Sequence, residues 1–199
     1  MQSENKTNTA FLSDELLLLL KRQHFHLIIT GERHRGKSTL LNTIISNLNT
    51  PTKGFYTTKI TGKENIEDGV YIHDVQTSIS NRFYDSNNRV ATLPSDKTLC
   101  SDMVSHIEIF NTLGVTLLSD IKTNDLIVMD EIGVLESKAT NFTSSILNAF
   151  NSENSLVAVI KRAYTPFLDS LLTHKNNTAI IEVLTNYHYS FKILPNQPL

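Results

Sequence analysis

The residues best suited to chemistry lie in one short stretch, where the chain reads GERHRGKST from Gly31 to Thr39. The two glycines let the backbone curl tightly, so that successive N–H groups point inward at phosphate oxygens. The helix expected to follow adds a partial positive charge at its start. In this pattern Lys37 reaches the β- and γ-phosphates of a nucleotide, and the Ser38 hydroxyl ligates Mg²⁺. We therefore expect phosphate to be bound by Gly31, Glu32, Arg33, His34, Arg35, Gly36, Lys37, Ser38 and Thr39.

A second stretch, LIVMDE from Leu126 to Glu131, supplies two carboxylates at the end of a continuous apolar run. A buried strand that ends in an acid places that acid beside the phosphate loop. We expect Asp130 to hold Mg²⁺ together with Ser38, in part through water. Glu131 can polarise an attacking water, so Glu131 and Lys37 are the expected catalytic residues. The alternative interpretation is that both acids only cap the next turn.

The surrounding elements must hold the phosphate stretch between a strand and a helix. Residues 24–30 (HFHLIIT) predict the strand, and residues 37–48 carry an apolar stripe with helical spacing. Further strands are predicted at LIVMD, SLVAVI and AIIEVL, with helical segments near 109–121, 141–150 and 166–174. A short helix over 13–22 comes first. This alternation predicts an α/β fold with a mostly parallel sheet and helices on both faces.

The segment from about residue 54 to residue 104 breaks this alternation. Short β-rich runs such as FYTTKIT and VYIHDV are separated by turn residues, which predicts β-hairpins inserted into the parallel fold. Residues 1–12 are polar and lack an apolar period, so we expect a frayed or disordered tail. Residues 13–199 are predicted to form one domain, because a chain of 199 residues suits a single core.

Composition excludes several functional classes. Eighteen Lys and Arg against twenty Asp and Glu give a net charge of −2, which argues against nucleic acid as the main ligand. The single cysteine, Cys100, excludes an internal disulfide and favours a reducing compartment. The leucines at 16–20 are too few to cross a membrane, so we expect a cytoplasmic protein without a membrane partner. No feature identifies a protein partner.

Three motifs together carry a resemblance to a known family. They are the phosphate stretch 31–38, the sequence GFYT at 54–57, and DEIG at 130–133 with Glu136 three residues further on. Over roughly residues 24–186 the chain resembles the small nucleoside-triphosphatase family that includes the human cancer-related enzyme and its thermophile homologues. The resemblance implies a P-loop NTPase with a RecA-like sheet core and slow, Mg²⁺-dependent hydrolysis of several nucleoside triphosphates. It would assign the phosphate role to Gly31, Gly36, Lys37 and Ser38, and the metal and water roles to Asp130 and Glu131.

The chain departs from the family pattern at three places. Arg33 and His34 stand where the family usually has Pro and Gly, so this loop is more cationic. After GFYT the family tends to carry acids and an Arg, whereas residues 58–61 read TKIT. Near the end the family favours Thr-x-x-Asn-Arg, but residues 185–189 read TNYHY. The Arg is missing, and with it any charge-stabilising role near residues 188–189.

The leading interpretation is Mg²⁺-dependent hydrolysis of nucleoside 5′-triphosphates, such as ATP or GTP, to the diphosphate and phosphate, with a broad or unknown base preference. Two other functions stay open. A small-molecule, nucleoside-like kinase would add an acceptor pocket and usually an Arg-rich lid, and segment 52–124 holds only two arginines. A nucleotide-gated binding module would use slow hydrolysis to reset its affinity for a partner. The adjacent acids Asp130 and Glu131 favour activation of water.

Several further residues are weaker candidates. Phe55 and Tyr56 could stack on a nucleobase, but aromatic residues in a hairpin more often pack the core. The possible transition-state cations are Arg82, Arg89 and Arg162.

Overall fold

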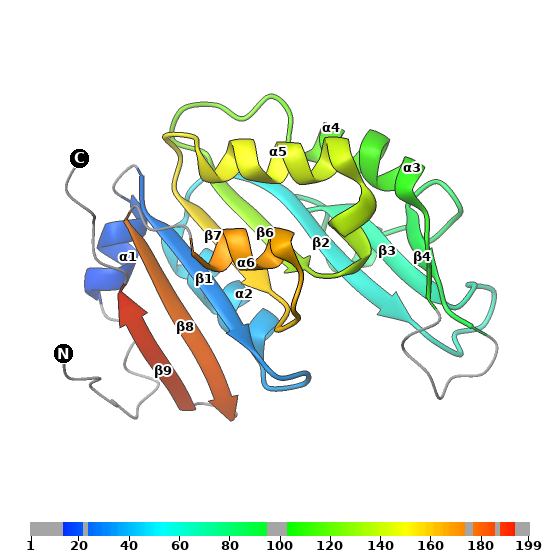
Figure 1. Ribbon diagram of the computed structural model, residues 1–199, viewed down its shortest axis with the longest axis horizontal. Coiled ribbons are helices and arrows are strands. Elements are labelled where there is room, and N and C mark those ends of the chain that lie inside the picture. Colours follow the sequence, from blue (N-terminus) through cyan, green and yellow to red (C-terminus); the bar gives the residue numbers. More distant parts are fainter. Residues whose placement is uncertain (1–13, 22–23, 95–102, 174–176, 186–187, 194–199) are drawn as a thin grey trace.

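A computed structural model of the chain describes residues 14–21, 24–94, 103–173, 177–185 and 188–193. The expected tail at residues 1–12 and Cys100 lie outside these residues. The described residues form one sheet flanked by helices (Figure 1).

The sheet has nine strands among the described residues, in the order β5-β4-β3-β2-β6-β7-β1-β8-β9. Five neighbouring strands run parallel: β2 (Thr52–Ile60), β6 (Leu126–Ile132), β7 (Leu156–Ile160), β1 (His26–Gly31) and β8 (Thr178–Thr185). β1 is the first of these strands in the chain but lies inside the sheet. The strands that follow it lie on both sides: β2, β6 and β7 on one side and β8 on the other, so the strand order reverses at β1. In an open α/β sheet, a ligand crevice is expected at such a reversal, at the carboxyl ends of the strands.

Antiparallel strands extend both sides of this parallel core. β3 (Gly69–Asp74), β4 (Arg89–Thr92) and β5 (Val104–Ser105) continue from β2, which confirms the predicted hairpins. β9 (His188–Ile193) pairs with β8 and was not predicted. β2 pairs with β6 only as far as Tyr56, while its residues 57–60 pair with β3 among the described strands. The end of the β2–β3 hairpin therefore projects past the carboxyl edge of the parallel strands (Figure 1).

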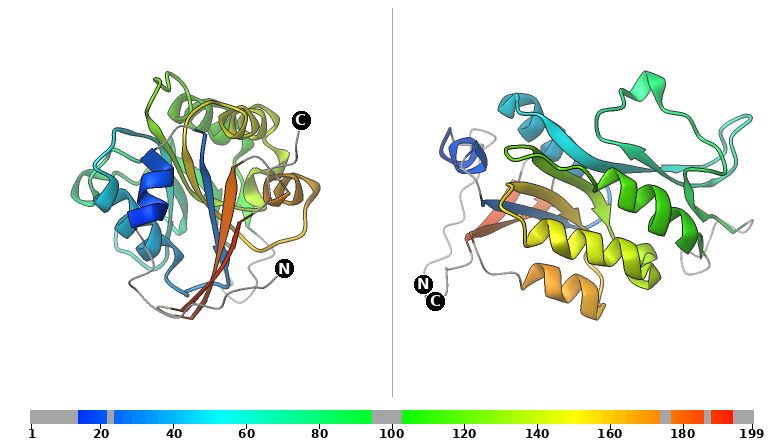
Figure 2. Two further views of the ribbon diagram at one scale, coloured as in Figure 1. Left: turned by 90° about the vertical axis from the view of Figure 1, so that its left-hand side faces the viewer. Right: turned by 90° about the horizontal axis from the view of Figure 1, so that it is seen from above.

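Helices cover both faces of the sheet, as predicted. α1 (Asp14–Lys21) and α2 (Lys37–Leu48) lie on one face. α3 (Ile107–Ile109), α4 (Val115–Leu117), α5 (Thr140–Phe150) and α6 (Pro166–Leu172) lie on the other, as the view from above shows (Figure 2). The helix expected over 109–121 is instead broken by a π-helical turn, Phe110–Gly114. No helix in the described part of the chain is long and apolar enough to cross a bilayer.

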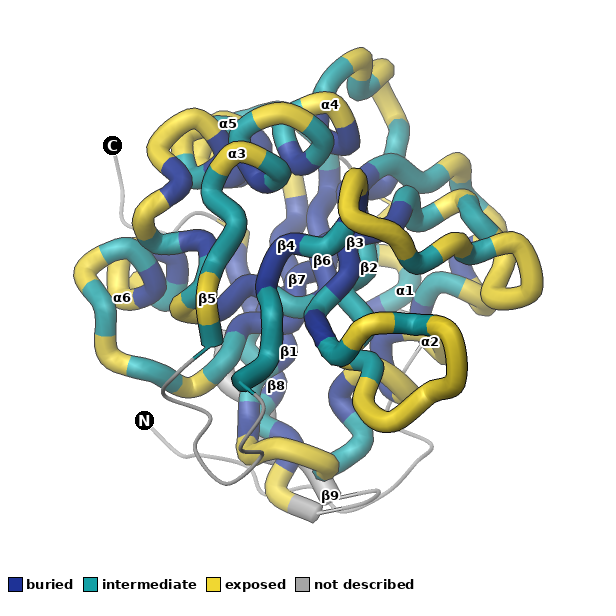
Figure 3. Tube along the Cα trace, turned by 90° about the vertical axis from the view of Figure 1, so that its right-hand side faces the viewer, coloured by how far each residue is buried: buried dark blue, intermediate teal, exposed yellow. Residues whose placement is uncertain are grey.

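Two apolar clusters, one on each face, fix the sheet between the helices. Leu41 and Ile44 of α2 pack against the β1 side chain of Ile29, whereas Phe142 of α5 packs with Met129 of β6. β1, β6 and β7 are continuous apolar runs because both of their faces are covered. Figure 3 shows the resulting contrast between buried central strands and exposed connecting loops. The rigid sheet thus presents the ends of β1 and β6 to the same edge.

Candidate active site

The phosphate loop joins β1 to α2 and is shaped by left-handed backbone conformations. Gly31 has φ +131°, and a Cβ there would come within 2.4 Å of the Val183 carbonyl oxygen of β8. Gly36, with φ +92°, precedes the first turn of α2. His34 has φ +58°, a conformation that costs a non-glycine residue free energy. The loop therefore keeps the curled backbone of a phosphate-binding loop although His34 replaces the family's usual glycine.

Lys37 lies inside this curl rather than in solvent. It is only 7% exposed, and its Nζ donates hydrogen bonds to the carbonyl oxygens of Gly31 at 3.2 Å and Glu32 at 2.8 Å. The same Nζ lies 3.8 Å from a carboxylate oxygen of Glu131. The ammonium group is thus held between the loop and the end of β6, where it can meet the terminal phosphates of a nucleotide.

Asp130, at the end of β6, is paired with Ser38 at the start of α2. Asp130 is 7% exposed, and burial raises the pKa of its carboxyl to about 6, while a hydrogen bond with the Ser38 side chain acts in the opposite direction. A hydroxyl and a carboxylate are the oxygen ligands that Mg²⁺ prefers when phosphates and water complete its shell. In the described part of the chain, no three or more His, Cys, Asp or Glu side chains are grouped so that they could hold a metal ion. The donor set therefore fits Mg²⁺ held jointly with a nucleotide.

Glu131 is fixed through its backbone by the neighbouring strand β2. Its N–H donates a hydrogen bond to the Thr57 hydroxyl at 3.1 Å. Its side chain is 34% exposed and faces Lys37 across 3.8 Å. Thr57 is the last residue of GFYT, so that motif gave a signal for this role, although we did not include Thr57 among the expected site residues.

Glu136, the last acid of DEIGxxE, is buried beside the site. It is 3% exposed and accepts a hydrogen bond from the Gly133 N–H at 2.9 Å. The pKa of its carboxyl is raised to about 7, chiefly by burial and to a smaller extent by the neighbouring Glu131, while backbone hydrogen bonds and Lys161 act against this rise. The carboxyl group supports the turn that follows β6.

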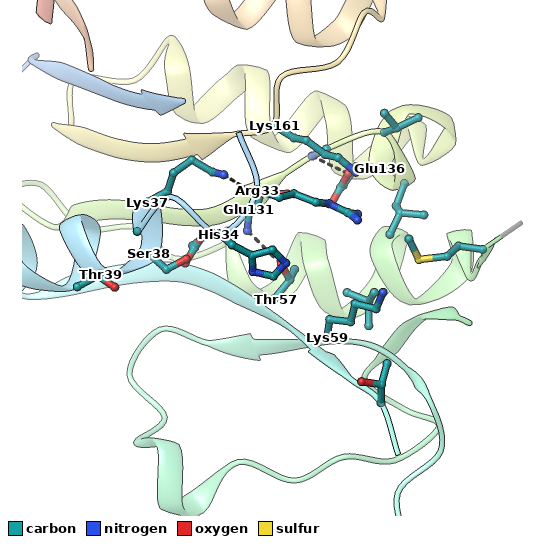
Figure 4. A pocket seen from close by; sticks show the side chains of 18 residues that line it. Arg33, His34, Lys37, Ser38, Thr39, Thr57, Lys59, Glu131, Glu136 and Lys161 are labelled. Carbon is teal, nitrogen blue, oxygen red and sulfur yellow. Dashed lines mark hydrogen bonds and ion pairs between the residues drawn. The ribbon is translucent and has the colours of Figure 1, made fainter. Parts of the chain in front are cut away.

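A cavity of about 900 Å³ connects these groups (Figure 4). Of the expected site residues, it is lined by Arg33, His34, Gly36, Lys37, Ser38, Thr39, Asp130 and Glu131. Gly31, Glu32 and Arg35 are not among the lining residues, and Glu32 and Arg35 form an exposed ion pair at 2.8 Å. The lining residues that sequence reasoning missed are Thr57, Lys59, Thr61, Val70, Met103, Gly133, Val134, Leu135, Glu136 and Lys161.

Comparison with known proteins agrees with this geometry. The model of a protein family described as NTPase matches residues 26–188. The chain belongs to this NTPase family. It is 28% identical over 159 residues to the nucleoside-triphosphatase THEP1 of Thermotoga maritima, covering 79% of this chain and 85% of the relative. It is 27% identical over 167 residues to the protein of that name from Natranaerobius thermophilus, covering 81% and 88%.

The fold of this NTPase also has a solved counterpart. The crystal structure of THEP1 from the hyperthermophile Aquifex aeolicus superposes with a TM-score of 0.63 at 20% identity, covering 80% of this chain and 90% of that one. The expected P-loop NTPase fold, with parallel strands and an antiparallel extension, is confirmed.

None of the three candidate arginines of this NTPase lines the cavity among the described residues. Arg89 pairs with Glu67, and Arg162 pairs with Glu182 at 2.8 Å. The Arg82 guanidinium lies 5.1 Å from the centre of the Tyr56 ring. Besides Lys37, the cavity is lined by Lys59 and Lys161. Neither of these two lysines belongs to a sequence motif that would have predicted it.

Two other expectations concern the periphery of the site. Phe55 is fully buried and packs on Phe142, with ring centroids 5.3 Å apart, so it belongs to the core of this NTPase. In the stretch 185–189, where the family's Arg is missing, Asn186 and Tyr187 lie outside the described residues.

Proposed function

We propose that this NTPase hydrolyses nucleoside 5′-triphosphates to the diphosphate and inorganic phosphate, with Mg²⁺ as cofactor. The observation that supports this most is the approach of Lys37 to Glu131, at 3.8 Å, in the same cavity as Ser38 and Asp130. A phosphate-binding cation, a metal-binding pair and a candidate water-orienting carboxylate thus share one edge of the sheet.

The proposed roles follow from these positions. The N–H groups of the loop bind the phosphates, and Lys37 releases its carbonyl partners on the loop to bind the terminal phosphates. Ser38 and Asp130 would hold Mg²⁺, which neutralises charge on the β- and γ-phosphates when bound. Glu131 orients a water for in-line attack, and the backbone hydrogen bond to Thr57 keeps its peptide in place.

Broad use of nucleoside triphosphates is expected because the proposed contacts all address phosphate and not the base. The cytoplasm remains the proposed compartment, on the single cysteine of the sequence.

The test is release of inorganic phosphate from ATP, GTP, CTP and UTP, each with Mg²⁺ and with excess chelator. We expect release from several of the four that depends on Mg²⁺ and needs no acceptor molecule. Equal rates in chelator would contradict the metal role of Ser38 and Asp130, and no release from any triphosphate would contradict the proposed hydrolysis.

A further inference from the structure

The cavity continues past the point where the γ-phosphate is expected. That phosphate is expected beside Lys37, at the start of α2, and Glu131, at the end of β6. In phosphoryl transfer the nucleophile approaches in line, from the side opposite the leaving group. The space beyond Glu131 is therefore the side of attack, and ten residues outside the expected site line the cavity there and around it.

One wall of this space is the projecting β2–β3 hairpin. Thr57, Lys59 and Thr61 alternate along the end of β2 and its continuation, so their side chains fall on one side of the hairpin. Val70 of β3 stands opposite Lys59 in the register and lines the same cavity. A phosphate loop needs no such hairpin to bind a triphosphate, so the hairpin adds surface for something else.

The opposite wall comes from the residues that follow β6 and β7. Gly133, Val134 and Leu135 form the turn after β6. Lys161 follows β7, and its Cδ would lie 3.4 Å from a Cβ placed on Gly133, so its alkyl chain lies along this turn. Together with Val70 and Met103, these residues give the distal half of the cavity apolar sides.

Two lysines outside the phosphate loop, Lys59 and Lys161, face this space. Neither Lys59 nor Lys161 forms an ion pair with a described residue, and the two side chains come from opposite walls (Figure 4). Burial raises the pKa of the Glu136 carboxyl to about 7, although the interaction with Lys161 lowers that pKa, so the carboxyl is only partly ionised near pH 7. Two ammonium groups that form no ion pair with a described residue, set above apolar side chains, suit a ligand with a doubly charged phosphate and an apolar or aromatic body.

We propose that the distal half of the cavity is an acceptor subsite for a small phosphate monoester of the nucleoside monophosphate class. This inference rests on the proposed function, because it uses the same bound triphosphate. An oxygen of the acceptor phosphate attacks the γ-phosphorus, a new P–O bond forms, and the bond from the γ-phosphorus to the β–γ bridging oxygen breaks. The nucleoside diphosphate leaves with that electron pair, and the monophosphate becomes a second diphosphate.

The charges give the physical reason for this assignment. Two phosphate anions must meet for this transfer, and their repulsion is reduced only by cations at the point of contact. Lys37 serves the triphosphate, and Lys59 and Lys161 would serve the acceptor.

The experiment follows the γ-phosphate of labelled ATP with Mg²⁺ and each of the common nucleoside 5′-monophosphates as probes. The matched nucleosides, which lack the phosphate, serve as controls. We expect label in a nucleoside diphosphate with at least one monophosphate and with none of the nucleosides. We expect Lys59→Gln and Lys161→Gln each to lower the ratio of transferred to hydrolysed phosphate by about tenfold or more, the usual scale for a lost charge-assisted contact.

The matched control is Lys63→Gln, an exposed lysine that follows the same strand and does not line the cavity. It should keep the wild-type ratio of transferred to hydrolysed phosphate. Label that appears only as inorganic phosphate with every probe would overturn the acceptor subsite and leave the proposed hydrolysis standing. Saturable binding of a monophosphate without transfer, measured by calorimetry beside a non-hydrolysable ATP analogue, would equally overturn the acceptor role. If no inorganic phosphate is released from ATP in the absence of an acceptor, the result would instead count against the proposed hydrolysis.

Discussion

At the scale of single residues, Lys37 is the side chain whose charge the proposed reaction needs most directly. Its ammonium is buried against two loop carbonyls and lies near the Glu131 carboxylate, so its described partners are all polar groups of the site. Lys37→Ala should therefore lower kcat/KM for triphosphate hydrolysis by about 10²-fold or more, because charge stabilisation at the phosphates is lost. The thermal midpoint should change little. An active, folded Lys37→Ala protein, measured by phosphate release and by circular dichroism, would exclude this loop as the phosphate site.

The adjacent acids Asp130 and Glu131 should fail in different ways when substituted. Asp130 is buried beside Ser38, whereas Glu131 is partly exposed and faces Lys37. Asp130→Asn should weaken Mg²⁺-dependent nucleotide binding and turnover together. Glu131→Gln keeps the shape of the side chain and removes its charge, so kcat should fall by about 10²- to 10⁴-fold with nucleotide affinity nearly unchanged. Titration with a fluorescent triphosphate analogue measures nucleotide affinity separately from kcat. If Glu131→Gln turns over at the wild-type rate, Glu131 only caps the turn and is not catalytic.

At the scale of elements, the phosphate loop contains the least expected backbone conformation. His34 adopts φ +58°, a left-handed conformation that glycine adopts without strain and that is the usual reason for a glycine in such a loop. Here the position carries an imidazole side chain. If the backbone N–H groups bind the phosphates, His34→Gly should keep KM and kcat within about threefold of wild type. His34→Val should raise KM by about tenfold or more, because a β-branched residue strongly resists this conformation. Steady-state kinetics of the two variants test this, and a large loss in His34→Gly would show that the imidazole itself contacts the nucleotide.

How far sequence predicts the elements depends on whether their signal is local. The loop, β1, α2 and β6 were predictable because a motif and apolar runs fall together in one stretch, and Lys37, Ser38, Asp130 and Glu131 converge as expected. Lys59 and Lys161 were not, because they line the same cavity only through the pairing of β2 with β6 and of β6 with β7. At the break, Phe110–Gly114, Gly114 packs so closely on the ring of Phe142 that an added Cβ would lie 2.8 Å from it. Such contacts between distant segments leave no periodicity to read.

At the scale of the whole molecule, the parallel sheet provides the rigid frame and the antiparallel extension shapes the site. β6 is the shared element, since it pairs with β7 on one side and with β2 on the other. The phosphate loop and the acids at the end of β6 would suffice to bind a triphosphate. The hairpin and the turn after β6 line the rest of the cavity, where the proposed acceptor subsite lies.

Glu136 links this turn to the stability of the whole molecule, and it predicts how stability changes with pH. The pKa of its carboxyl is raised by burial to about 7, above the ordinary value of 4.5, so the folded state binds the proton more tightly than the unfolded state does. The protonated carboxyl therefore contributes to stability. This contribution is fully present below the pKa of the unfolded state and is lost as the pH rises through the pKa of the folded state. The free energy of unfolding should fall by about 3 kcal/mol between pH 4.5 and 7 on account of this group. Glu136→Gln keeps a carbonyl acceptor for the Gly133 N–H but cannot titrate, so urea unfolding of this variant should show a flatter dependence on pH. The control is Glu108→Gln, at an exposed glutamate of α3, which should retain the wild-type slope. Identical slopes for wild type and Glu136→Gln would mean that Glu136 is ionised in the folded protein and is stabilised by the cations of the cavity.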